Sequence, residues 1–366
     1  MDLETILIHG GGKNVLGAVQ TPLFLTSAFC DAEKNGYSYT RCSNPTREAL
    51  EKTVALAEKG AYGFAFSSGL AAEDAVFSLF PNIICGKHVY GGTKRLLSMY
   101  GNVTFADMTD LNEVGRLADG KDVLIFAETP SNPLLKVCDI SRLADIAHAN
   151  GGVLAVDNTF LTPYLQNPLT LGADIVVHSA TKYLCGHHDV IAGIAVTSDA
   201  DIAEKLHFAS YTKGSCLSPF DSYLVKRGME TLPLRMKKHC ENAGKVFEYL
   251  KSSPSFADVV YAYDPSSPSF EIMKKQSSGG GGMIAFTVKT DPREFVKGLR
   301  LIGYAESLGG NASLITHPYS QTHASLSEEE KRKAGITPNL LRLSVGTENA
   351  EDIIGDLERA ASAGAK

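Results

Sequence analysis

Two charged residues in the middle of the chain each follow an apolar run. Asp157 closes GVLAV, and Lys182 stands four residues after DIVVH, in a segment that also holds Ser179 and Thr181. A single charge in such a place is typical of a solvated loop. In an open α/β sheet, however, ligands bind outside the carboxyl ends of the strands. If these runs are neighbouring parallel strands, the four side chains meet at one sheet edge.

A third segment has the pattern of an anion site. FSSGLAAEDA reads as a strand that ends at Ser67-Ser68-Gly69 and opens a helix. The exposed N–H groups of a first helical turn attract phosphate, and a glycine lets the backbone approach it. The same pattern also fits a simple N-cap without a ligand. Taken alone, this segment does not decide between the two.

An amine, a carboxylate and a phosphate cradle at one sheet edge are the groups that pyridoxal phosphate requires. The lysine forms a Schiff base, and the carboxylate keeps the pyridine nitrogen protonated so that the ring withdraws electrons from the substrate carbon. Burial and nearby positive charge lower the pKa of such a lysine, which lets it move protons. We therefore predict a pyridoxal-phosphate site around Lys182 and Asp157.

Short apolar runs alternate with helical patterns in the first 200 residues. SGLAAEDAVFSLF and ISRLADIAHAN carry apolar residues at helical spacing. Strands that alternate with helices predict a mostly parallel sheet that is covered on both faces. The runs that we expect to be strands are 63–66, 123–127, 153–156, 175–177 and 191–196.

The chain divides into three predicted parts: an extended arm over 1–38, a ligand-binding domain over 39–227, and a smaller α+β domain over 228–366. A long amphipathic stretch from Pro219 to Leu250 connects the two domains, and Pro233 is expected to bend it. The segment 266–282, with SSPS and SSGGGG, is read as a flexible connector rather than a lid. The overall prediction is an α/β domain followed by a smaller α+β domain.

Composition excludes several classes of protein. The 366 residues carry a net charge of −6, which argues against nucleic-acid and anionic-membrane partners. We find no signal peptide and no apolar run long enough to span a bilayer. Seven cysteines stand singly without metal spacing, and the adjacent His187 and His188 cannot easily face one ion. These features predict reduced thiols in the cytoplasm and no metal site.

Several blocks together resemble the pyridoxal-phosphate enzymes of cysteine and methionine metabolism, a family that includes cystathionine γ-synthase, the cystathionine lyases, methionine γ-lyase and the homoserine-ester sulfhydrylases. The resemblance runs nearly end to end. It implies an aspartate-aminotransferase-like fold (fold type I) and a homotetramer built from dimers with shared sites. The blocks are YTRCSNPTREALE, FSSGLAA, VYGGTKR, ETPSNPLLKVCDI, VDNTFLTPYLQNPLTLGADIVVHSATKYL, PFDSYLVKRGMETLPLRM, AESLGG and LLRLSVGTE.

The resemblance also implies a role for each matching residue. Lys182 would bind the cofactor covalently and carry protons, with Tyr90 stacked on the ring and Asp157 at its nitrogen. Arg342 would hold the substrate α-carboxylate in a bidentate fork, aided by Ser307 and by Asn132, which also belongs to the cofactor site. The phosphate would be held by Ser179, Thr181, the N–H groups of Gly69 and Leu70, and Tyr39 and Arg41 of a neighbouring subunit.

Glu306 is the residue that narrows the range of possible substrates. In the similar cystathionine γ-enzymes, a glutamate here faces the distal ammonium of cystathionine, although a solvated charge is the alternative. Arg95 would likewise meet a distal carboxylate or an acyl ester, unless it is a surface cation. Ser38 removes an acidic partner that the family often has, and Gly92 replaces the cysteine typical of methionine γ-lyase.

We therefore expect a cytoplasmic trans-sulfuration enzyme that performs γ-elimination or γ-replacement on cystathionine or homoserine-derived amino acids. The residues do not decide whether the enzyme cleaves or synthesises cystathionine. The alternative activities are O-acyl-homoserine sulfhydrylase, cystathionine β-lyase and methionine γ-lyase. Cys185, three residues after Lys182, is read as an inert replacement. A regulatory protein that keeps the cofactor without turnover is disfavoured, because the residues expected to do the chemistry are present.

Overall fold

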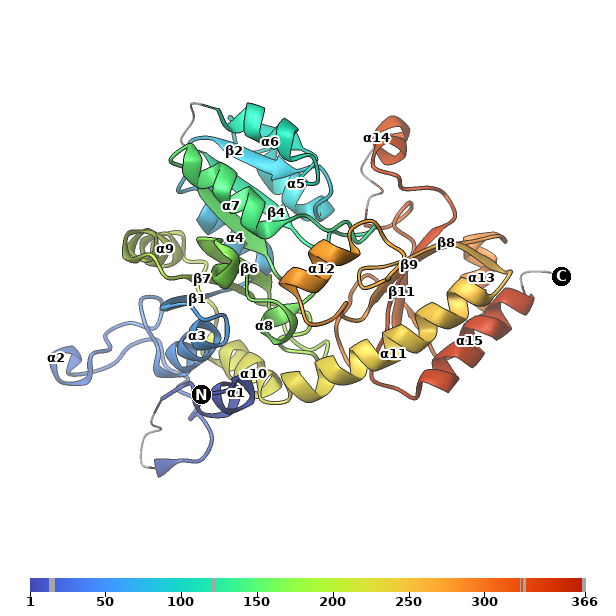
Figure 1. Ribbon diagram of the computed structural model, residues 1–366. Coiled ribbons are helices and arrows are strands. Elements are labelled where there is room, and N and C mark those ends of the chain that lie inside the picture. The colour runs from blue at the N-terminus through green and yellow to red at the C-terminus, as the bar shows by residue number, and fades with distance from the viewer. Residues whose placement is uncertain (13–16, 120–122, 323, 325–326, 364–366) are drawn as a thin grey trace.

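The computed structural model describes residues 1–12, 17–119, 123–322, 324 and 327–363. Two sheets lie side by side, and the long helix α11 runs along the second one (Figure 1). The larger sheet has the strand order β1-β7-β6-β5-β4-β2-β3. Its strands are β1 (Tyr62–Phe66), β2 (Ile83–Gly86), β3 (Val103–Ala106), β4 (Leu124–Glu128), β5 (Val153–Asp157), β6 (Ile175–Ser179) and β7 (Gly193–Thr197).

All strands of this sheet run in one direction except β7, which is antiparallel to both β1 and β6. The carboxyl ends of β1, β4, β5 and β6 therefore lie at the same edge. Each of the five predicted runs overlaps a strand, and the mostly parallel sheet is confirmed. The sequence reading missed β2 and β3, which are four residues each.

Helices cover both faces of the larger sheet, which explains why its strands are continuous apolar runs. On one face, α4 (Gly69–Phe77), α5 (Gly91–Leu97) and α9 (Ala200–Lys213) bury the side chains of Phe126 and Ala155. On the other face, α6 (Leu111–Ala118) and α7 (Ile140–Ala149) bury Ile125 and Leu154. Neighbouring residues of one strand thus serve opposite cores.

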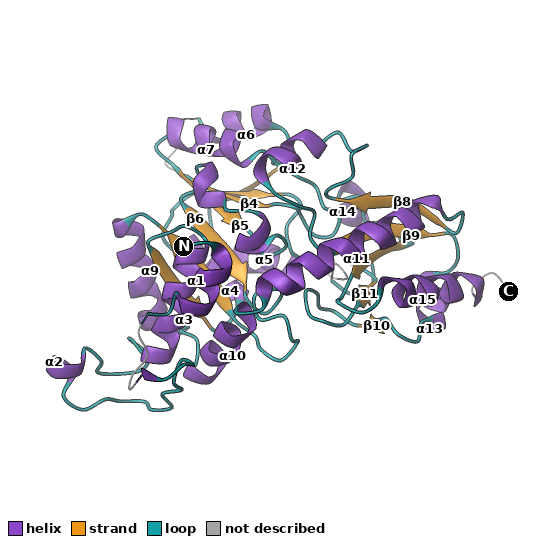
Figure 2. Ribbon diagram, turned by 60° about the horizontal axis from the view of Figure 1, so that its bottom comes forward, coloured by secondary structure: helices purple, strands orange, loops and turns teal. Residues whose placement is uncertain are grey.

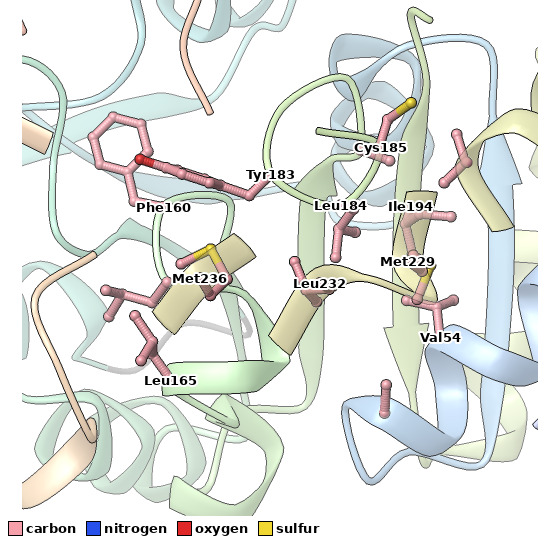
Figure 3. Packing of buried hydrophobic residues seen from close by; sticks show 14 of the residues in the cluster. Val54, Phe160, Leu165, Tyr183, Leu184, Cys185, Ile194, Met229, Leu232 and Met236 are labelled. Atoms are coloured by element: carbon pink, nitrogen blue, oxygen red, sulfur yellow. The ribbon is translucent and has the colours of Figure 1, made fainter. Parts of the chain in front are cut away.

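The amphipathic connection forms two helices, α10 (Pro219–Met229) and α11 (Leu232–Ser252). The helical stretch is interrupted just before Pro233. This proline lies in the first turn of α11, where its missing N–H costs no hydrogen bond. Met229, Leu232 and Met236 point into one core with Tyr183 and Leu184, which directly follow Lys182 in the chain (Figure 3). The packing of Tyr183 and Leu184 in this core therefore fixes the position of the chain at Lys182.

The smaller sheet has the order β10-β11-β12-β9-β8. Its mixed pairing, with α11 and two C-terminal helices on one face, confirms the predicted α+β part (Figure 2). Its elements are β8 (Phe256–Tyr261), β9 (Met283–Val288), α13 (Pro292–Gly298), β10 (Gly303–Tyr304), β11 (Leu314–Thr316), α14 (Glu328–Lys333), β12 (Leu340–Ser344) and α15 (Ala350–Ala363). Among the described residues, no helix has the length and apolar content needed to cross a membrane.

The N-terminal arm is not extended throughout, in contrast to the prediction. Its helix α1 (Leu3–His9) buries Leu7 in the main core, and the ammonium of Lys226 donates to the carbonyl of Leu7 at 2.9 Å. A second short helix, α2 (Ala32–Asn35), lies in a part of the arm that extends away from the rest of the chain (Figure 1). The remaining elements near the arm and the larger sheet are α3 (Pro45–Ala57), α8 (Thr162–Leu165) and a 3-10 turn at Pro168–Leu171.

The segment 266–282 is also different from the flexible connector that we expected. It contains α12 (Phe270–Gln276), and the amide of Gln276 donates to the carbonyl of Cys138 at 3.1 Å. Its last three glycines are buried. A Cβ on Gly280 would lie 2.6 Å from the ring of Tyr261, and one on Gly282 would lie 2.9 Å from the Tyr183 hydroxyl. These glycines therefore serve close packing between the two sheets rather than flexibility.

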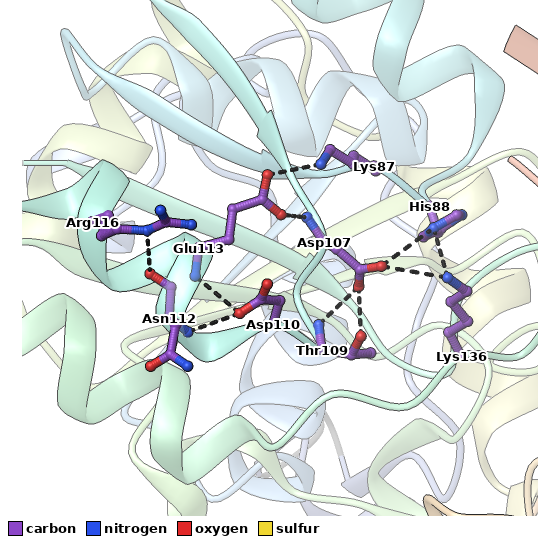
Figure 4. Close-up of polar contacts among 9 residues, drawn as sticks. All are labelled: Lys87, His88, Asp107, Thr109, Asp110, Asn112, Glu113, Arg116 and Lys136. Carbon is purple, nitrogen blue, oxygen red and sulfur yellow. Dashed lines mark hydrogen bonds and ion pairs between the residues drawn. The ribbon is translucent and has the colours of Figure 1, made fainter. Parts of the chain in front are cut away.

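A polar network fixes the turn that precedes α5 (Figure 4). Glu113 accepts from the ammonium of Lys87 at 2.8 Å and from the backbone N–H of Asp107 at 2.9 Å. The ammonium of Lys136 lies 2.9 Å from the ring of His88 and 3.5 Å from the Asp107 carboxylate. Burial and the charge of Lys136 lower the pKa of His88 to about 4. The turn that leads to residue 90 is therefore fixed by the contacts of Lys87 with Glu113 and of His88 with Lys136.

Candidate active site

A cavity of about 250 Å³ opens at the carboxyl edge of the larger sheet. Its walls come from the ends of β1, β4, β5 and β6, and residues next to the smaller sheet close it. Most of the predicted site residues line it. They are Gly69, Leu70, Tyr90, Asn132, Asp157, Ser179, Thr181, Lys182, Glu306, Ser307 and Arg342.

Asp157 is the last residue of β5 and is largely buried, opposite Glu128 at the end of β4. The backbone N–H of Thr159 donates to its carboxylate at 2.8 Å. Burial raises the pKa of Asp157, whereas the hydrogen bonds from Thr159 and the nearby charge of Lys182 oppose the rise. The carboxylate is thus held in place for a cationic partner inside the cavity.

Lys182 follows β6 in a tight turn, in which its N–H donates to the carbonyl of Ser179 at 3.1 Å. Burial, followed by the positive charge of Arg342, lowers the pKa of Lys182 to about 8. The unprotonated fraction of the amine near neutral pH is therefore much larger than for an ordinary lysine. This is the state in which a lysine attacks a carbonyl.

The anion cradle lies where β1 passes into α4. The hydroxyl of Ser68 caps the helix by accepting from the N–H of Ala71 at 3.1 Å. A Cβ on Gly69 would lie 2.9 Å from the Cβ of Ser179, so only a glycine lets this turn approach β6 so closely. Ser68, Gly69 and Leu70, at the start of α4, line the cavity, as the phosphate interpretation requires.

Thr181 has a structural task beside its predicted one. Its hydroxyl oxygen accepts from the N–H of Ala192 at 3.0 Å and lies 3.2 Å from the Ala192 carbonyl. This pair ties the Lys182 turn to the chain that leads into β7. A phosphate at this position would share the hydroxyl with the backbone.

Arg342 lies on β12 and reaches the cavity from the smaller sheet. Its guanidinium donates to the side-chain oxygen of Asn132 at 2.8 Å, to the carbonyl of Ser307 at 3.1 Å and to the hydroxyl of Thr316 at 3.2 Å. Within the described residues its buried Nε has no hydrogen-bond partner. Burial lowers the pKa of Arg342 to about 10, so it stays charged at neutral pH. A buried cation with a spare donor is a suitable receptor for a carboxylate.

Tyr90 caps the cavity, with 38% of its surface exposed. Its N–H donates to Glu128 at 2.8 Å, and the other oxygen of Glu128 accepts from the N–H of Asn132 at 2.7 Å. A Cβ on Gly92 would lie 2.3 Å from the Tyr90 ring. The absence of a side chain at residue 92 therefore permits this position of the ring.

Three polar residues that line the cavity were not among the predicted site residues: Glu73, Glu128 and Thr159. Glu128 had a usable signal, because it closes the apolar run VLIFA just as Asp157 closes GVLAV. Glu73 lies within a helix, and the helical pattern alone did not tell which face points to a ligand.

Three predicted residues do not line the cavity of their own chain: Tyr39, Arg41 and Arg95. Arg95 is exposed on α5, which favours the surface-cation alternative. The guanidinium of Arg41 donates to the carbonyl of Tyr211 at 2.7 Å and stacks on the ring of Tyr39, which is 44% exposed. The expectation that Tyr39 and Arg41 serve a neighbouring subunit stays a prediction.

The thiol of Cys185 points away from the cavity and donates to the Asp189 carboxylate at 3.2 Å. Burial and this hydrogen bond raise the pKa of Cys185 to about 12, which fits an inert thiol. His187 is engaged with the carbonyl of Cys185 at 2.7 Å. In the described part of the chain, no group of three metal-ligating side chains lies together.

The residues present fit pyridoxal phosphate. Lys182 offers an amine of lowered pKa, and Asp157 a buried carboxylate for the ring nitrogen. The turn at Gly69 offers N–H groups for the phosphate, and the spare Nε of Arg342 suits an amino-acid carboxylate. All four groups face one cavity.

Comparisons with known proteins agree with this assignment. A cystathionine gamma-lyase of Bacillus subtilis (strain 168) is 44% identical over 98% of this chain and 99% of its own length. A cystathionine beta-lyase of Lactococcus lactis subsp. cremoris (strain MG1363) is 45% identical, with 98% of each chain covered. The crystal structure of a cystathionine gamma-lyase from Lactobacillus plantarum complexed with L-serine is 43% identical, with a TM-score of 0.96 over 100% of both chains.

The family profile described as Cys/Met metabolism PLP-dependent enzyme matches residues 4–362, nearly the whole chain. The match includes every residue that lines the cavity. The chain therefore belongs to the pyridoxal-phosphate-dependent trans-sulfuration enzymes of cysteine and methionine metabolism.

Proposed function

We propose that this enzyme breaks or forms the Cγ–S bond of cystathionine, as a cystathionine γ-lyase or a cystathionine γ-synthase. The observation that carries the proposal is the position of Glu306. It lies at the mouth of the cavity, and the carbonyl of the next residue, Ser307, holds Arg342. An acidic side chain thus stands near the α-carboxylate receptor, where the distal ammonium of cystathionine can reach it.

The Glu306 carboxylate is exposed and makes no hydrogen bond or ion pair within the described residues. Its negative charge nevertheless acts on the guanidinium of Arg342. A substrate with a carboxylate at one end and an ammonium at the other satisfies both groups. Methionine has no second ammonium, so Glu306 favours cystathionine over methionine as the ligand.

The residues that would hold pyridoxal phosphate follow from the cavity. The N–H groups of Gly69 and Leu70, with Ser179 and Thr181, would bind the phosphate. Asp157 would keep the proton on the ring nitrogen, and Tyr90 would cover the ring. The bound cofactor supplies a ring that withdraws electrons from the substrate α-carbon.

Lys182 would carry the protons of the reaction. Its amine, with a pKa lowered to about 8, takes the proton from the substrate α-carbon. After it has passed this proton to the bound cofactor, the amine would take a second proton from the β-carbon and donate it to the sulfur as the Cγ–S bond breaks. Arg342 holds the α-carboxylate during both transfers and keeps the carbon chain above the Lys182 amine.

The assembly and location that we propose are a cytoplasmic homotetramer of dimers with shared sites. The exposed Tyr39 and Arg41, which do not line the cavity of their own chain, support the sharing of sites. The seven free cysteines support a reducing compartment.

The test is to add cystathionine to the purified yellow enzyme and to identify the products. Cysteine with α-ketobutyrate supports the γ-lyase, and cystathionine made from a homoserine ester and cysteine supports the γ-synthase. Homocysteine with pyruvate would instead show cleavage at Cβ. Rapid release of methanethiol from methionine, or sulfide-dependent homocysteine formation from a homoserine ester, would also contradict the proposal.

A second test examines Glu306 itself. Glu306→Ala is expected to raise the KM for cystathionine about tenfold or more, because a charged contact is lost. The same change should affect substrates without the distal ammonium far less. Glu294→Ala, which removes an exposed glutamate on α13 outside the cavity, is the matched control. Equal effects of Glu306→Ala on both kinds of substrate would reject the role of Glu306.

A further inference from the structure

Glu73 is a buried carboxyl group in the cavity wall for which the reaction above has no use. It lies on α4, one helical turn after the anion cradle, and only 4% of its surface is exposed. It lines the same cavity as Asp157 and Glu128. Three carboxyl groups thus share one wall, and they cannot all be ionised without strong mutual repulsion.

The hydrogen bonds show which of the three retains a proton. Asp157 accepts from the backbone N–H of Thr159, and Glu128 accepts from two backbone N–H groups, at 2.7 and 2.8 Å. Glu73 accepts a single bond, from the hydroxyl of Thr93 on α5 at 3.1 Å. Donors and nearby cations stabilise a carboxylate. Asp157 has the backbone and side-chain donors of Thr159 and the charge of Lys182, whereas Glu73 has one neutral hydroxyl, so Glu73 is the group that stays protonated.

The second oxygen of Glu73 has no hydrogen-bond partner within the described residues. A buried polar atom without a partner is costly, and it points to a missing ligand atom or water. Burial and the charge of Asp157 hold the pKa of Glu73 well above its usual range. The unpartnered oxygen is the one that would carry the proton as an O–H group, and Glu73 lines the cavity in which an acceptor would bind.

We propose that Glu73 acts as a neutral acid and donates a hydrogen bond from the Asp157 wall of the cavity to the bound cofactor. Because Glu73 keeps its proton, Asp157 remains the anion that would face the ring nitrogen. This role rests on the proposed function only in requiring that pyridoxal phosphate binds in this cavity. Glu73 is then a cofactor-binding residue that acts through its hydroxyl, not through a negative charge.

The first experiment detects the proton directly. The infrared spectrum of the protein at neutral pH is expected to contain a carbonyl band of the protonated Glu73 carboxyl group that is lost in Glu73→Gln, beside the band of Glu128, whose pKa burial raises to about 8. Asp74→Asn is the matched control. Asp74 is the next residue of the same helix, but its carboxylate binds Tyr100 and Lys213 outside the cavity. The band should persist in this control, and its persistence in Glu73→Gln would overturn the proposal.

The second experiment measures the dissociation constant of pyridoxal phosphate by equilibrium dialysis. Glu73→Leu removes the donor and is expected to weaken binding about tenfold. Glu73→Gln keeps an N–H donor at the same place and should regain most of this loss. Equal binding by the wild type and Glu73→Leu, or equal losses in both variants, would overturn the role of the donor. A wild-type chain that binds no cofactor would instead overturn the proposed function itself.

Discussion

At the scale of single residues, the charge of Lys182 opposes folding of the cofactor-free protein. Burial and Arg342 lower its pKa from 10.5 to about 8. The unfolded chain therefore binds the proton more tightly, and the cost is full below pH 8 and disappears as the pH rises towards 10.5. At pH 7 this cost is roughly 1–3 kcal/mol.

Lys182→Met is accordingly expected to raise the free energy of unfolding of the cofactor-free protein at pH 7 by roughly 1–3 kcal/mol. The gain should shrink at pH 10, where the folded amine is neutral and the unfolded amine has begun to lose its proton. Urea titrations at the two pH values measure it. A variant that is less stable than the wild type at pH 7 would contradict the assignment.

Arg342 makes a second prediction at this scale, because three hydrogen bonds already fix its guanidinium. A lysine has a single ammonium and cannot keep these bonds and also form a fork with a carboxylate. Arg342→Lys is expected to raise the KM for amino-acid substrates about 30-fold or more, with much less change in cofactor binding. Arg359→Lys on α15, outside the cavity, serves as the control. Equal losses of substrate and cofactor binding would indicate a general collapse of the site.

At the scale of elements, the close approach of α4 to β6 depends on Gly69. In Gly69→Ala the new Cβ would lie 2.9 Å from the Ser179 side chain, so the helix must move away. We expect the dissociation constant of pyridoxal phosphate to rise at least tenfold, since the N–H groups of the cradle move with the helix.

The control for Gly69→Ala is another helical glycine. A Cβ on Gly115 in α6 would meet nothing within 4 Å. Gly115→Ala should therefore stabilise the protein by about 0.5–1 kcal/mol and leave cofactor binding unchanged. Unchanged binding in Gly69→Ala as well would show that the cradle tolerates a shifted helix.

The elements that sequence predicts well are those whose pattern reflects burial on both faces. β4, β5 and β6 are continuous apolar runs, and their ends located Asp157, Ser179 and Lys182 without a structure. β3 was missed because Thr104 and Phe105 are exposed at the sheet edge, so no apolar run marks it. The glycine run before β9 was misread, because the same composition serves mobility in one context and close packing in another.

At the scale of the whole molecule, the proposed sharing of sites between subunits predicts complementation between chains. Lys182→Ala and Arg41→Ala should each lose most activity as separate proteins. In mixed oligomers, some sites would combine a native Lys182 from one chain with a native Arg41 from another. Activity should therefore return, up to about a quarter of the wild-type value for random dimers. No recovery after refolding the mixture would contradict sites shared between subunits.

The two sheets contribute different ends of the cavity, with Lys182 in the turn after β6 of the larger sheet and Arg342 on β12 of the smaller one. A ligand that is bonded to the first and gripped by the second is a cross-link between two parts of the chain. Because the ligand binds only when both parts are folded, its binding free energy stabilises both parts together. We therefore expect the protein with a bound ligand to unfold more cooperatively on heating than the protein without one.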